Sequence, residues 1–224
     1  MEPNFTILST LDNSNTLKNS VIDEHYHSTN GAITESKHVF IASAYEKSIS
    51  QKSLHVLEIG FGTGLNCLLT QQKAEELHLH TYYYGIEKFP VPFDIIQLLN
   101  YSQQLNTLNE PFELIHKAQW GCNVNISEYF TITKLQTDLT ELQIPNIGFD
   151  VVYFDAFSPD IQPEMWAEPV FKAIFESMNS QGILTTYCAK GEVRRTLQRV
   201  GFKVERLPGP PGKREMIRAT KNTL

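Results

Sequence analysis

Apolar residues form two kinds of pattern from residue 53 onwards. Short apolar runs, ended by glycine or acidic residues, predict buried β-strands. Longer segments between them carry apolar residues at helical spacing, as at Val170, Ile174 and Met178. Strands are expected at 54–59, 81–86, 129–136, 149–154, 182–187, 202–207 and 215–219. Helices are expected at 65–77, 92–104, 163–178 and 191–200, with Pro169 kinking the third or starting a new segment.

The order of these elements predicts the architecture. Strands that alternate with helices form a mostly parallel sheet covered on both faces. Only the short loop 208–212 (PGPPG) joins the last two strands, so they are expected to pair antiparallel. An α/β fold with a mostly parallel seven-stranded sheet and an antiparallel C-terminal hairpin resembles the Rossmann-like sheet of class I S-adenosylmethionine (SAM) methyltransferases.

Residues 1–50 show a different pattern, in which short stretches are broken by turn residues such as those at 28–31 (STNG). We expect a hairpin leading to a helix there, as a small extension before a main domain at 51–224. The N-terminus has no basic region followed by a long apolar run, and no apolar run of about 18 residues occurs, so neither a signal peptide nor a transmembrane helix is expected.

The cysteines and histidines do not form a framework for disulfides or metal. Cys67, Cys122 and Cys188 are scattered, and the pairs His25/His27 and His78/His80 lack a third ligand at suitable spacing. We therefore expect no metal and a cytoplasmic location. Separately, no obligate protein partner is expected.

Charge is distributed unevenly along the 224 residues. The formal net charge of −6 argues against a general nucleic-acid binder. However, residues 187–224 hold ten of the 19 Lys and Arg residues and only three of the 25 acids. This basic end indicates a surface that could contact an RNA backbone, with a solvated helix face as the alternative. The candidate contacts are Arg194, Arg195, Lys213 and Arg214.

A glycine loop follows the first strand of the main domain, where ligands of such sheets bind. Its sequence, from Glu58 to Gly64, is EIGFGTG, and it opens a helix. This context favours a nucleotide-type cofactor loop over an ordinary turn. Leu65 stands where a dinucleotide fingerprint has its third glycine, which disfavours NAD.

Acidic residues follow the next strands. Glu87 could accept hydrogen bonds from ribose hydroxyls, or it could be a surface residue. Asp138 could accept from an adenine amino group or cap a helix. Asp155 follows the central strand, opposite the glycine loop, where a carboxylate could meet an amine or cationic substrate. A capping role is its alternative.

Four blocks of residues occur in order along the chain: 60–66 (GFGTGLN), 87–90 (EKFP), 154–159 (FDAFSP) with 163–166 (PEMW), and 213–216 (KREM). In this order they resemble the methyltransferase part of the MnmC-type tRNA 5-methylaminomethyl-2-thiouridine biosynthesis proteins. The similarity covers about residues 20–219 and includes Tyr26, His27, Ser28, Gly31, Glu35 and Phe40 near the N-terminus.

The resemblance implies methyl transfer from SAM to the aminomethyl nitrogen of a wobble uridine in the tRNA anticodon stem-loop. It implies a cofactor site, which we place at Glu58, Gly60, Phe61, Gly62, Thr63, Gly64, Asn66, Glu87, Lys88 and Asp138. It also implies that Asp155 is the catalytic residue, which we expect chiefly to orient the amine. Phe157 and Trp166 could stack on the base, or they could pack in the core. A chain of this length leaves no room for the family's FAD-dependent oxidase part, so a stand-alone methyltransferase without FAD is expected.

Two alternatives remain open at this stage. A small-molecule amine transferase of the aminopropyltransferase type also combines a glycine loop with acids near an amine. The basic C-terminal end argues against a polyamine substrate, which is itself a cation. A non-catalytic SAM- or nucleotide-binding module would bind the cofactor without transferring anything to RNA.

Overall fold

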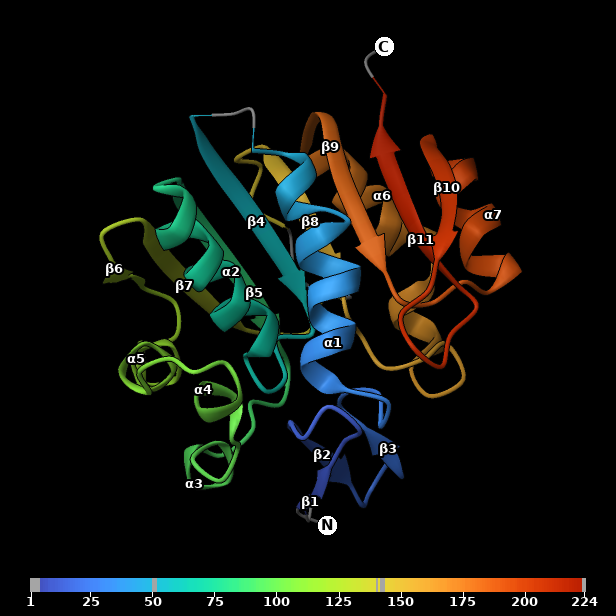
Figure 1. Cartoon of the computed structure of the whole chain (residues 1–224). Coiled ribbons are helices and arrows are strands. Elements are labelled where there is room, and N and C mark those ends of the chain that lie inside the picture. The colour runs from blue at the N-terminus through green and yellow to red at the C-terminus, as the bar shows by residue number, and fades with distance from the viewer. Residues whose placement is uncertain (1–4, 50–51, 140, 142–143, 223–224) are drawn as a thin grey trace.

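A central sheet organises the computed structural model, which describes residues 5–49, 52–139, 141 and 144–222. Within these residues the sheet has eight strands in the order β10-β11-β9-β8-β4-β5-β7-β6 (Figure 1). The strands are β4 (Ser53–Ile59), β5 (His80–Glu87), β6 (Asn123–Ser127), β7 (Phe130–Gln136), β8 (Phe149–Phe154), β9 (Met178–Thr186), β10 (Phe202–Pro208) and β11 (Glu215–Lys221).

The pairing confirms the predicted α/β architecture. Strands β9, β8, β4, β5 and β7 run parallel, and β11 and β10 add an antiparallel hairpin beside β9. All seven predicted strands are present. The eighth, β6, pairs antiparallel with β7 and was not predicted. Its sequence, NVNIS, is rich in residues that are usually depleted in strands, so its pairing depends on β7 rather than on local preference.

Two helices have the predicted bounds, α2 (Leu65–Leu77) and α7 (Gly191–Val200). The segment at 163–178 is a 3₁₀ turn (Pro163–Trp166) followed by α6 (Glu168–Ser177). Pro169 lies in the first turn of α6, so it starts a new segment, as one of the two expectations had it.

The prediction of a single helix at 92–104 is wrong. It is two short helices, α3 (Phe93–Ile96) and α4 (Tyr101–Gln104). Asn100 lies between them, and its side-chain amide donates to the Asn13 carbonyl and accepts from the Asn15 N–H, at 2.9 and 2.8 Å. These hydrogen bonds to the N-terminal hairpin stabilise a non-helical conformation at Asn100, so the helix is interrupted there. A further helix, α5 (Glu110–Lys117), was not predicted.

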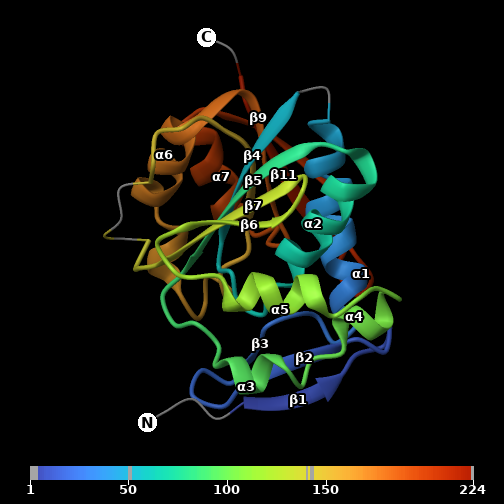
Figure 2. The same ribbon diagram turned by 90° about the vertical axis from the view of Figure 1, so that its left-hand side faces the viewer.

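Helices cover both faces of the sheet (Figure 2). Alternate residues of β4 serve the two layers, since Leu54 and Val56 pack with α2, while Leu57 and Ile59 pack with α6 and α7. Of the helices in the described residues, none is long and apolar enough to cross a membrane.

The N-terminal segment forms the predicted hairpin and helix. Strands β1 (Phe5–Ser9), β2 (Asn15–Asn19) and β3 (Glu24–His25) make a small antiparallel sheet beyond the carboxyl ends of the parallel strands (Figure 1). Helix α1 (Ala32–Ser36) follows and continues as a π-helical turn, Lys37–Ala42, and a 3₁₀ turn, Tyr45–Lys47. The domain boundary expected at residues 50–51 lies outside the described residues and stays a prediction.

Candidate functional site

A cavity of about 480 Å³ lies between the carboxyl ends of the parallel strands and the N-terminal sheet. Parallel strands place the residues that follow them at one edge of the sheet, so the predicted positions converge there. Those that line the cavity are Gly60, Phe61, Gly62, Thr63, Asn66, Glu87, Lys88, Asp138, Asp155, Phe157 and Lys213.

The glycine loop passes close to its neighbours. Gly60 has φ +85°, and a Cβ there would lie 2.6 Å from the Asp155 carbonyl oxygen. Gly62 has φ +50°, and its Cβ would lie 3.1 Å from the Tyr26 ring. Both positions therefore favour glycine, and both residues line the cavity.

Four of the predicted cofactor residues have contacts within the protein that support the loop. The Phe61 and Thr63 side chains are buried, and Thr63 Oγ1 hydrogen-bonds with His27 at 2.7 Å. Gly64 begins α2 at φ +71° and faces His116. Glu58 is buried and does not line the cavity. Phe61 and Thr63 nevertheless line the cavity, and contact of these four residues with a cofactor stays a prediction.

Glu87 is bound to the loop that it faces. Its two carboxylate oxygens accept the N–H groups of Gly62 and Phe89, at 3.0 and 2.9 Å. Burial raises the pKa of Glu87, and these hydrogen bonds oppose the rise. A carboxylate oxygen can accept more than one hydrogen bond, so capacity for hydroxyl donors remains.

Lys88 and Asp138, both predicted, lie in the cavity wall as an ion pair of 2.6 Å. The pair joins the ends of β5 and β7. The helix that Asp138 was alternatively expected to cap would include residues 140 and 142–143, which lie outside the described residues.

Asn66 connects two carboxyl groups. Its Nδ2 donates to Asp155 Oδ2 at 2.8 Å and to Glu58 Oε1 at 2.9 Å. Glu58 also accepts the Tyr83 hydroxyl at 2.7 Å, and burial raises its pKa well above the usual range. Asn66 Oδ1 is buried without a hydrogen-bond partner in the described part of the chain. An unpaired buried acceptor in a cavity wall is suited to a ligand donor.

Asp155 has an unusual environment for a carboxylate. Burial first, and then the nearby carboxylate of Glu35, raise its pKa to about 7. The hydrogen bond from Asn66 and the cation of Lys213 act in the opposite direction. A carboxylate with this pKa can accept or give up a proton near neutral pH.

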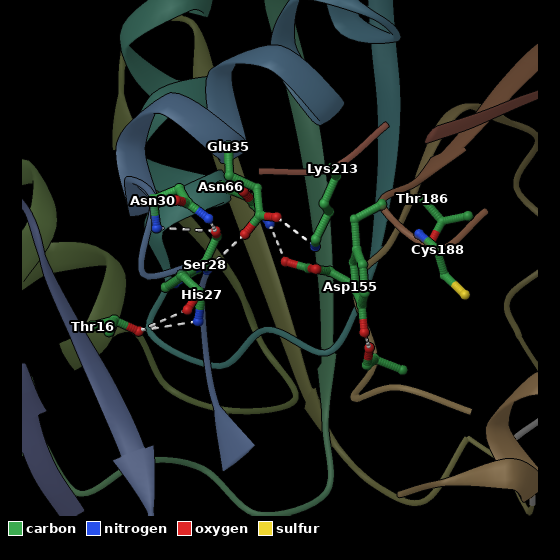
Figure 3. Close-up of polar contacts among 12 residues, drawn as sticks. Thr16, His27, Ser28, Asn30, Glu35, Asn66, Asp155, Thr186, Cys188 and Lys213 are labelled. Atoms are coloured by element: carbon green, nitrogen blue, oxygen red, sulfur yellow. Dashed lines mark hydrogen bonds and ion pairs between the residues drawn. The ribbon is translucent and has the colours of Figure 1, made fainter. Parts of the chain in front are cut away.

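Sequence reasoning noticed Glu35 only within the resemblance. In the structure Glu35 Oε2 accepts the Ser28 N–H at 2.8 Å, and Oε1 forms a 2.7 Å ion pair with Lys213. Figure 3 shows Glu35, Lys213, Asn66 and Asp155 directed toward one another. Lys213 was expected to contact the RNA backbone from the surface. Its ammonium instead points into the cavity and pairs with Glu35, and its role in substrate binding stays a prediction. No local pattern gives this direction, since Glu35 and Lys213 are 178 positions apart.

The two predicted stacking residues differ. Phe157 lines the cavity and packs edge-on against Tyr26 with ring centroids 5.2 Å apart. Trp166 is 6% exposed, packs against Phe154, and donates from Nε1 to the Phe157 carbonyl at 2.8 Å. The structure therefore corrects the stacking role of Trp166 in favour of its core-packing alternative.

The remaining basic candidates lie outside the cavity. Arg195 forms a 2.7 Å ion pair with Glu192 on the same helix, α7. Arg194 is half-buried on α7, and Arg214 is exposed. Within the described residues, no group of three His, Cys, Asp or Glu side chains is arranged to hold a metal ion.

Comparisons with known proteins agree with the resemblance predicted from the sequence. A family model described as S-adenosyl-L-methionine-dependent methyltransferase matches residues 107–222. The chain is similar to the tRNA 5-methylaminomethyl-2-thiouridine biosynthesis bifunctional protein MnmC of Cupriavidus necator, with 32% identity over 211 residues, 88% of this chain and 32% of that protein. The Cupriavidus metallidurans protein of the same name is 31% identical over 96% of this chain and 34% of its own length. The chain thus spans about a third of the length of these relatives.

Among solved structures, the chain is similar to MNMC2 from Aquifex aeolicus. The TM-score is 0.77 at 26% sequence identity, and the match covers 100% of this chain and 72% of that chain.

Proposed function

The chain belongs to the family of S-adenosyl-L-methionine-dependent methyltransferases, and on this premise we propose that it methylates the aminomethyl nitrogen of 5-aminomethyl-(2-thio)uridine at the tRNA wobble position. The observation that carries the proposal is the position of Asp155, a half-buried carboxylate between Asn66 and the Glu35–Lys213 pair, which is suited to an amine. The names of the MnmC relatives supply the tRNA substrate class.

The cavity residues fit the cofactor. A volume of about 480 Å³ is in the range that holds a nucleoside-sized ligand. Gly60 and Gly62 would let it approach the backbone, Glu87 would accept ribose hydroxyls, and Asp138 would accept an adenine amino group. When bound, SAM supplies an activated methyl group on a sulfonium sulfur.

Asp155 would prepare the amine. An alkylammonium with a pKa of about 10 has no free lone pair and must lose a proton before it can attack. An ordinary aspartate, with a pKa of about 4, is a poor acceptor for that proton. The pKa of about 7 reduces this mismatch, so Asp155 can orient the amine and also accept its proton. The hydrogen bond from Asn66 would fix the carboxylate in place.

The tRNA would present its wobble base as an extruded nucleotide. A base inside a stacked loop cannot reach a cavity of this kind, so it must leave the stack. Phe157 lines the cavity two residues after Asp155 and offers an aromatic surface. Arg214 is exposed beside Lys213 and is available to a phosphate.

A direct assay tests the proposal. The chain is incubated with methyl-labelled SAM and tRNA that carries 5-aminomethyl-2-thiouridine, and the RNA is digested to nucleosides. Label is expected in the wobble nucleoside, with none in an unmodified transcript of the same tRNA. SAM binding without any labelled nucleoside would contradict the proposal and favour the non-catalytic module.

A further inference from the structure

The Lys213 ammonium at the amine end of the cavity has unused donor capacity. It is 34% exposed, and one of its three N–H donors is directed to Glu35 Oε1 at 2.7 Å. The ammonium also lies 3.9 Å from the centroid of the Tyr187 ring. Among the described residues it forms its ion pair with Glu35 and none with Asp155. Space for a ligand atom therefore remains between an N–H donor and an acceptor.

We propose that Lys213 determines substrate specificity by donating a hydrogen bond to a carbonyl oxygen next to the amine that Asp155 receives. This inference rests on the proposed function and names the chemistry that the site selects: a primary amine beside a hydrogen-bond acceptor. In 5-aminomethyluracil the aminomethyl carbon is attached next to the carbon that bears O4. Amine and carbonyl thus lie on one edge of the ring and match the acceptor and donor on the cavity wall (Figure 3).

The corresponding cytosine base, 5-aminomethylcytosine, has the opposite hydrogen-bonding character next to the aminomethyl group. It has an amino group in place of O4, and this group is a donor. Two donors would then face each other, and the half-buried ammonium would lose a hydrogen bond to the base that the analogue cannot replace. A site built around a fixed donor rejects such an analogue more strongly than a merely apolar pocket does.

The fold holds Lys213 in this direction from three sides. Glu35 is 7% exposed and is itself fixed by the Ser28 N–H. Tyr187 donates its hydroxyl to the Ala156 carbonyl at 2.9 Å, which anchors the ring under the ammonium. The Lys213 N–H donates to the Pro210 carbonyl at 2.9 Å within the loop before β11. Preorganisation of this kind avoids much of the entropy cost of ordering a lysine on binding.

The test compares two anticodon stem-loops that differ only in the wobble base, 5-aminomethyluridine or 5-aminomethylcytidine. We expect the wild type to favour the uridine substrate by about 10- to 100-fold in kcat/KM, the scale of one hydrogen bond to a charged group. In Lys213→Met this ratio should fall toward one. Lys190→Met is the matched control, because Lys190 is an exposed lysine paired with Asp160 outside the cavity, and it should keep the ratio. SAM binding by each variant checks its fold.

If Lys213→Met does not fold, Glu35→Gln gives a second reading. Glutamine still accepts the Ser28 N–H but removes the charge that pairs with the Lys213 ammonium. The preference in kcat/KM for the uridine stem-loop should therefore fall in part. Equal transfer to both stem-loops by the wild type, or an unchanged ratio in the variants, would overturn the inference and leave the proposed function standing. Transfer to neither stem-loop would contradict the proposed function and this inference together.

Discussion

Lys213 and Arg195 are both basic residues of the C-terminal end, yet their ion pairs differ in kind. Lys213 pairs with Glu35, which is 178 positions away, nearly buried and held by a backbone N–H. Arg195 pairs with Glu192, three positions away on α7, and both side chains are more than half exposed. An exposed pair of the second kind contributes little to stability, because water competes for both charges. Only the first pair is fixed well enough to shape a site.

The largest expected effect comes from the acceptor at the centre of that site. Replacing Asp155 by Ala should lower kcat of methyl transfer by about 100-fold or more, because the amine loses both its orienting partner and its proton acceptor. SAM affinity, followed by calorimetry, should change little. A rate near that of the wild type would remove Asp155 from the mechanism.

The next largest effect is expected from a substitution in the glycine loop, compared with one at a glycine that has no close neighbours. In Gly60→Ala the new Cβ would overlap the Asp155 carbonyl oxygen, and the backbone at φ +85° is strained for alanine. We therefore expect loss of SAM binding and a loss of about 1–3 kcal/mol in the free energy of unfolding. Gly121 has a similar φ of +78°, but nothing lies within 4 Å of its Cβ position. Gly121→Ala should therefore keep SAM affinity. Thermal melts with and without SAM measure the stability and SAM binding of both variants. Similar losses of SAM binding in the two variants would show that the close contact between Gly60 and the Asp155 carbonyl does not matter.

The pH dependence of activity tests how Lys213 acts on Asp155. Asp155 accepts a proton only when ionised, so kcat/KM should fall as the pH drops through about 7, the pKa of this carboxyl. The Lys213 cation lowers that pKa, so Lys213→Met should move the acid limb of the profile to higher pH. Arg195→Gln, outside the cavity, should leave the limb in place. A downward movement in Lys213→Met would contradict the electrostatic account.

The smallest effects concern the outer basic residues. Removing one phosphate contact typically weakens RNA binding and lowers the salt slope by about one. We expect this for Arg214→Gln, because Arg214 is exposed and directly follows Lys213 in the loop before β11. Arg195→Gln should have a smaller effect, since Glu192 already neutralises that charge. Filter binding of tRNA at several salt concentrations compares the two, and a larger effect at Arg195 would reverse the ranking.

Much of the fold and part of the site could be predicted because the relevant signals are local. Gly60 and Asp155 directly follow strands whose apolar runs are plain in the sequence, and Glu87 ends such a strand. Parallel pairing brings these strand ends together. Strand β6 and the break at Asn100 could not be predicted, because they depend on β7 and on the N-terminal hairpin. Trp166 posed a similar problem, since its sequence neighbours suit both a rim and a core position.

The sequence by itself determined seven of the eight strands of the main sheet within the described residues, the antiparallel end and the placement of a glycine loop and three acids at one edge of the sheet. Backbone conformation follows mainly from residue spacing and from glycine, both readable in a short window. Only the tertiary structure decided that Lys213 points inward to Glu35 and that Glu58 lies behind Asn66 rather than in the cavity. The direction of a charged side chain depends on partners and burial supplied by distant segments, and no local pattern contains that information.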